Sequence, residues 1–207
     1  MAGRNLLLVE GSDDEHVVTH LCLHHGVPEF EIASQGGIKR LIESFPIRLK
    51  QSDLDALGVL VDADTDLQAR WRALRQHLVR AGYPKVPKLP KPAGTICQAP
   101  VDTLLPRLGI WLMPDNKTKG TLEDFLRFLV PAGSPLLAHV QQSVDGIPPG
   151  ERRFSALAQP KAIIHTWLAW QAEPGKPLGT AITAKYLDAS VPQVADFISW
   201  LRQLFFP

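Results

Sequence analysis

The chain has 207 residues, of which 45% are hydrophobic and 21% charged, and its formal net charge at pH 7 is +1. This composition is typical of a globular protein with one sizeable core, or one core with a helical appendage. A nearly neutral charge does not exclude a nucleic-acid partner, because acidic metal ligands can offset a local basic surface. Two cysteines are too few for a disulfide framework or a zinc cluster, which favours a cytoplasmic location. We expect neither a signal peptide nor a membrane contact, since no apolar stretch is long enough to span a bilayer.

A short apolar run at Asn5–Val9 predicts a buried strand that ends in Glu10. A helix is predicted to follow as far as about His25, with Ser12 or Asp13 as its N-cap. The carboxylate at the end of this strand therefore lies at a position where open α/β sheets place their ligands.

On this helix Asp14 lies four residues before Val18 and on the same side. We therefore expect Asp14 to face the sheet edge at which Glu10 emerges. The two acids would form one pair of carboxylates at the end of the strand.

The run Leu57–Val61 is apolar on both faces, which is typical of a strand in the middle of a parallel sheet. Asp62, Asp64 and Asp66 follow it at alternate positions. Three carboxylates at the end of a buried strand repel one another, and a hard divalent cation such as Mg²⁺ or Mn²⁺ would relieve that repulsion. The alternative is a polar loop that caps the helix starting near Leu67, with Asp64 or Asp66 as the N-cap.

Further strands are predicted at Phe30–Ala33, Thr95–Gln98 and Leu108–Met113. A helix from Ile38 should break or kink at Pro46, and another should be capped by Thr121, with Glu123 in its first turn. Beyond Ser134 the pattern predicts helices over Pro135–Val144, Phe154–Ala172 and Gln193–Phe206. The arginines after the aspartates are interpreted as solvating charges: Arg70, Arg72, Arg75 and Arg80. The predicted fold is α/β, a mainly parallel sheet flanked by helices, with a C-terminal helical extension.

The segments LLLVEGSDD and LGVLVDADTD, with the alternation of strands and helices, resemble a Toprim domain. This metal-binding catalytic domain is shared by topoisomerases, bacterial primases, recombination-repair proteins and the OLD (overcoming lysogenization defect) nucleases. In such families one strand ends in a glutamate followed by glycine and a later one in Asp-x-Asp, which Glu10-Gly11 and Asp62/Asp64 match. The resemblance implies a Toprim-like catalytic domain at residues 1–130 and a helical extension packed on the same core at 131–207.

The resemblance to OLD nucleases also implies a two-metal site. The matching residues are Glu10, Asp14, Asp62, Asp64, Glu123 and Lys161. Asp62 and Asp64 would hold one ion, Asp14 and Glu123 would complete a second site, and Glu10 would bridge the ions or transfer a proton. Lys161 would neutralise the phosphate in the transition state.

The implied function is Mg²⁺- or Mn²⁺-dependent hydrolysis of phosphodiester bonds, with DNA favoured over RNA as the substrate. Two alternatives stay open. One is a non-catalytic Toprim scaffold that binds nucleic acid or a protein partner in a defence or toxin system. The other is a different phosphoryl-transfer enzyme that acts on nucleotides.

Overall fold

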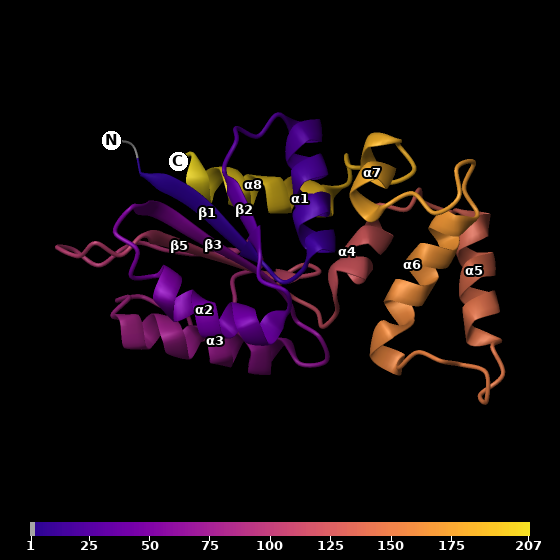
Figure 1. The fold of residues 1–207 in the computed structure, drawn as a ribbon, viewed down its shortest axis with the longest axis horizontal. Helices are drawn as coiled ribbons and strands as arrows, with labels where there is room; N and C mark the ends of the chain where they lie inside the picture. The colour runs from indigo at the N-terminus through magenta and orange to yellow at the C-terminus, as the bar shows by residue number, and fades with distance from the viewer. Residues whose placement is uncertain (1–2) are drawn as a thin grey trace.

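A five-stranded sheet forms the centre of the computed structural model, which describes residues 3–207 (Figure 1). The strands are β1 (Arg4–Val9), β2 (Glu31–Ser34), β3 (Leu54–Asp62), β4 (Thr95–Cys97) and β5 (Arg107–Met113). Their order across the sheet is β2-β1-β3-β5-β4, and all pairs are parallel except the antiparallel edge pair β4–β5. The predicted α/β class with a mainly parallel sheet is confirmed.

The register of the central strands brings their acidic ends together. In β3, Leu57, Val59, Leu60 and Val61 are all fully buried, as expected for the middle of a sheet. Val9 of β1 pairs with Leu60 of β3, so Glu10 and Asp62 emerge from neighbouring parallel strands at the same carboxyl edge.

Helices cover both faces of the sheet (Figure 1). On one face lie α2 (Ile38–Arg48) and α3 (Leu67–Ala81), and on the other lie α1 (Ser12–His25) and α8 (Pro192–Phe205). The alternation of strand side chains divides the core accordingly. In β1, Leu6 and Leu8 pack with the α2–α3 layer, whereas Leu7 and Val9 pack with the α1–α8 layer.

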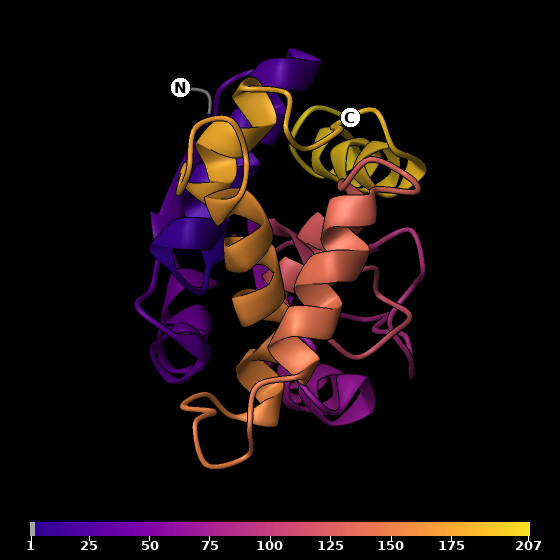
Figure 2. The ribbon, with the colours of Figure 1, turned by 90° about the vertical axis from the view of Figure 1, so that its right-hand side faces the viewer.

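The remaining helices lie beyond the carboxyl edge of the sheet, where α5 and α6 pack side by side (Figures 1 and 2). They are α4 (Leu122–Phe128), α5 (Pro135–Asp145), the 3₁₀ turn η1 (Ala156–Ala158), α6 (Gln159–Ala169) and α7 (Leu178–Thr183). Their apolar side chains join one hydrophobic cluster with the sheet, in which Phe125 and Trp167 share the core with Trp111. No helix within residues 3–207 is long and apolar enough to cross a membrane.

Three local predictions differ from the structure. The N-cap of α1 is Gly11 rather than Ser12 or Asp13, because Asp14 Oδ2 accepts the Gly11 N–H at 2.9 Å and closes the first turn from inside the helix. Helix α2 continues past Pro46, which lies in its last turn, where a missing N–H costs a single hydrogen bond. Helix α6 begins at Gln159 rather than Phe154, with Pro160 in its first turn, where proline is favoured.

Candidate active site at the carboxyl edge

A pocket of about 280 Å³ opens at the carboxyl edge, between the ends of β1 and β3 and the first turns of α1, α4 and α6. We call it the acidic pocket. Its charged lining residues are Glu10, Asp13, Asp14, Asp62, Glu123 and Lys161. The structure therefore brings together five of the six residues that the Toprim resemblance singles out, and Asp64 is the one that does not line this pocket.

Glu10 and Asp62 are each held by one carboxylate oxygen. Glu10 Oε1 accepts the N–H of Asp62 at 2.8 Å, and Asp62 Oδ1 accepts the N–H of Leu122 at 2.9 Å. Within residues 3–207, no hydrogen bond reaches Glu10 Oε2 or Asp62 Oδ2. The backbone thus fixes one oxygen of each carboxylate and leaves the other free of hydrogen bonds from the described residues.

Asp14 and Glu123 are the most deeply buried acids of the pocket, with 7% and 8% of their surface exposed. Glu123 Oε2 accepts the Thr121 hydroxyl at 2.9 Å. The capping box of α4 is closed by Asp124, whose Oδ2 accepts the Thr121 N–H at 3.0 Å. Helix capping therefore accounts for Asp124 but leaves the burial of Glu123 beside other acids without a capping explanation.

Lys161 supplies the positive charge of the pocket. Its Nζ lies 3.3 Å from Asp13 Oδ2 and 3.4 Å from Glu123 Oε1. Partial burial acts to lower the pKa of Lys161, but the carboxylates of Glu123 and Asp13 outweigh it and hold this pKa above its ordinary value. The lysine is therefore held in its charged form at the mouth of the pocket.

Asp64 is turned away from the acidic pocket. It adopts a left-handed backbone conformation, with φ of 53°, and its N–H donates to Gly120 O at 2.9 Å. Its carboxylate bonds to Arg70, which also donates from Nε to the backbone oxygen of Asp62 at 2.9 Å. The interpretation of Arg70 as a solvating charge is wrong, because this side chain holds together the segment that follows β3.

Asp66 has a clear structural role. Its Oδ1 accepts the Ala69 N–H at 2.9 Å and caps α3. The capping alternative is therefore confirmed for Asp66, and Asp64 is not the cap.

Burial and mutual repulsion raise the pKa values of three carboxyls in the acidic pocket, those of Asp62, Glu10 and Asp14. The pKa of Asp62 rises to about 9, first through burial and then through the charges of Glu10, Asp14 and Glu123. Burial raises the pKa of Glu10 to about 7, although the Asp62 amide and Arg70 oppose the shift. Burial also raises the pKa of Asp14 to about 6, against the hydrogen bond from Gly11. In the metal-free pocket these three carboxyls therefore keep their protons to a higher pH than in the unfolded chain.

The donor types of this pocket fit a hard divalent cation, since they are carboxylate oxygens. As the side chains stand, residues 3–207 contain no group of three or more histidine, cysteine, aspartate or glutamate residues that could hold a metal ion. A cation would therefore require the acids to move closer together than they lie here.

The fold and the pocket define a class of protein: an α/β chain with clustered acids at the carboxyl edge of a mostly parallel sheet. The chain belongs to the family described as "Protein of unknown function (DUF3226)", and the match covers residues 4–206. The match thus spans both the sheet and the helices that follow it. Comparison with curated proteins and with solved structures gives no match.

Proposed function

We propose that this protein is a divalent-metal-dependent nuclease that hydrolyses phosphodiester bonds of DNA. The observation that carries the proposal is the convergence of Glu10, Asp14, Asp62 and Glu123 on one pocket together with Lys161. Four acids from three separate chain segments gain nothing from packing against one another. Their meeting at the carboxyl edge agrees with the Toprim resemblance of the strand ends that carry Glu10 and Asp62.

The proposed ligands are carboxylate oxygens that the backbone already orients. Glu10 and Asp62 each keep one oxygen anchored on an amide, so that the other oxygen can face a cation without loss of the strand-end geometry. Asp14 and Glu123 supply the buried side of the pocket. When bound there, Mg²⁺ or Mn²⁺ ions would position the attacking water and stabilise the leaving 3′-oxygen.

Asp64 and Lys161 are assigned roles that require their present partners to change. Asp64 would join Asp62 in the site once its ion pair with Arg70 opens. Lys161 leaves Asp13 and Glu123 to pair with a nonbridging phosphate oxygen, where it neutralises the charge of the transition state.

A lysine and apolar groups lie next to the acidic pocket and offer contacts to a nucleotide that flanks the cleavage site. A neighbouring pocket of about 310 Å³ is lined by the acids Asp64 and Asp124, by Lys119, and by apolar side chains that include Leu157. Lys119 is exposed, and Leu157 exposes 48% of its surface. A cation and an apolar side chain beside the proposed cleavage site suit the phosphate and the sugar or base of a flanking nucleotide.

The direct test is nicking of supercoiled plasmid by the wild type, Asp62→Asn and Asp66→Asn, in Mn²⁺ and in chelator. Asparagine at 62 can still accept the Leu122 N–H but loses the charge. We expect Mn²⁺-dependent nicking by the wild type and a loss of roughly 10²–10³-fold in Asp62→Asn, as for removal of one group that stabilises transition-state charge.

Asp66→Asn is the matched control. It removes one carboxylate from the same loop, and asparagine caps helices as well as aspartate does. We expect it to cleave within about threefold of the wild type, because a well-capped surface position changes stability little. Nicking that persists in Asp62→Asn, or that needs no metal, would reject the proposal.

A further inference from the structure

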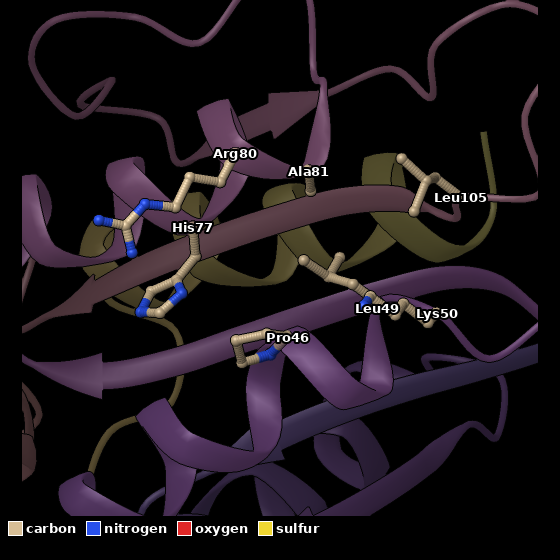
Figure 3. A pocket seen from close by; sticks show the side chains of 7 residues that line it. All are labelled: Pro46, Leu49, Lys50, His77, Arg80, Ala81 and Leu105. Atoms are coloured by element: carbon tan, nitrogen blue, oxygen red, sulfur yellow. The ribbon is translucent and has the colours of Figure 1, made fainter.

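A second pocket, of about 540 Å³, lies between α2 and α3 on the face of the sheet away from α1 and α8 (Figure 3). It is lined by the ends of both helices and by Leu105, which precedes β5. The end of α2 leads into the amino end of β3, and Leu105 leads into the amino end of β5, so the pocket lies at the opposite edge of the sheet from the acidic pocket. Its volume is within the range of about 300–1,000 Å³ that small-molecule sites occupy.

The lining combines an apolar part with nitrogen-bearing side chains (Figure 3). Pro46, Leu49, Ala81 and Leu105 supply the apolar part, and Leu49 is only 1% exposed. The His77 ring is fixed edge-on against the buried ring of Phe45, with 6.0 Å between the ring centroids. The histidine is therefore packed by the core rather than left free in solvent.

Three side chains that can donate hydrogen bonds border this pocket: Lys50, His77 and Arg80. No acidic residue lines it. Across residues 3–207, neither a salt bridge nor a side-chain hydrogen bond engages any of the three. These three side chains therefore keep donors free for a ligand next to the apolar part of the lining.

We propose that this pocket binds a small organic anion, with a phosphate or carboxylate head and an apolar body. Arg80, whose guanidinium lies beside the His77 ring in Figure 3, binds the head with two parallel N–H groups. Pro46, Leu49 and Leu105 contact the body, which gains from leaving water. The site is separate from the proposed nuclease centre and does not depend on it.

The test uses phenyl phosphate as the probe, with inorganic phosphate and phenol as its two halves. Binding is followed by amide chemical shifts in ¹⁵N-labelled protein, in chelator so that no metal recruits phosphate to the acidic pocket. We expect saturable shifts at Lys50, His77 and Ala81, with tighter binding of phenyl phosphate than of either half.

Arg80→Gln is the variant, and Arg72→Gln is the matched control. Arg72 is an exposed arginine on the same helix that does not line the pocket. Arg80→Gln should weaken the binding of phenyl phosphate at least about fivefold, as for loss of a charged hydrogen-bond donor, whereas Arg72→Gln should change the affinity less than about twofold. Shifts centred on the acidic pocket, equal weakening by both variants, or no saturable binding would each overturn the proposal.

Discussion

Asp62 combines an anchored oxygen with a strongly perturbed carboxyl. The fixed oxygen accepts the Leu122 N–H, while burial and neighbouring acids raise the pKa of the group to about 9. In the unfolded chain this carboxyl ionises near its ordinary value of 3.8. The metal-free native state therefore binds this proton more tightly than the unfolded state does.

The first prediction concerns the pH dependence of stability in chelator. Because the folded pKa is raised, the native state is favoured below the unfolded value of 3.8, and that advantage is lost as pH rises towards about 9. Asp62→Asn does not titrate, so it should exceed the wild type in free energy of unfolding by an amount that grows between pH 5.5 and pH 8.5. One unit of pKa shift is worth about 1.4 kcal/mol, and we expect a difference of at least about 1 kcal/mol at pH 8.5. Urea unfolding at pH 5.5 and pH 8.5 measures the difference in free energy of unfolding between the two proteins. The same difference at both pH values would contradict the assigned burial of this charge.

Helix α6 places a cation where the helix itself does not favour one. Lys161 lies in the first turn of α6, and helix N-termini favour negative rather than positive charge. Its position is explained by acids from two other helices, Asp13 of α1 and Glu123 of α4. The lysine thus joins three helices at one point on the rim of the acidic pocket.

The second prediction separates a structural from a catalytic role for this lysine. A half-exposed ion pair is worth about 0.2–1 kcal/mol, so Lys161→Gln should lower the free energy of unfolding by no more than that. If Lys161 neutralises the transition state, cleavage should fall at least about tenfold, which corresponds to about 1.4 kcal/mol of barrier. Lys176→Gln, which breaks the Lys176–Glu173 pair elsewhere on the surface, should leave cleavage unchanged. Full nicking activity in Lys161→Gln would limit the lysine to holding the helices together.

Elements with a strong local pattern could be predicted from the sequence. The two-sided apolar run of β3 predicts a central strand, and the helix signal after Val9 ends at His25 as expected. Helix α7 could not be predicted, because its six residues, LGTAIT, carry no helical repeat of apolar side chains. It forms against α1, and a Cβ on Gly179 would lie only 2.7 Å from the His16 oxygen. Helix α7 therefore depends on a long-range contact with α1, which no local sequence pattern indicates.

The placement of Arg70 and Asp64 could not be predicted for a similar reason. Spacing along the chain puts Arg70 one turn inside α3, which is compatible with solvent or with the strand end. Arg70 faces the strand end because Asp64 has a left-handed conformation and forms a bridge to Gly120, 56 residues later in the chain. Strand ends can thus be located from sequence, whereas the direction of each carboxylate depends on the loops that meet there.

At the scale of the whole molecule, the acidic pocket joins segments that are far apart in sequence. The end of β1, the end of β3 and the starts of α1, α4 and α6 all meet at its walls. A cation bound there would offset repulsion between these segments and would bind only the folded chain. Metal binding should therefore appear as a gain in global stability, independently of any nuclease assay.

The last prediction is the size of that gain and its dependence on one residue. At a hundredfold excess of Mn²⁺ over its Kd, mass action stabilises the native state by about 2.7 kcal/mol. For a chain of this size that corresponds to a rise in Tm of about 5–10 °C relative to chelator. Asp62→Asn should start from an equal or higher Tm in chelator and show a much smaller rise, because it has lost a principal ligand but kept the Leu122 hydrogen bond. Asp66→Asn, which keeps its cap on α3, should rise as much as the wild type. Thermal melts of the three proteins in chelator and in Mn²⁺, at matched ionic strength, measure these changes in Tm. An equal rise in Tm for the wild type and Asp62→Asn would show that Asp62 is not a metal ligand.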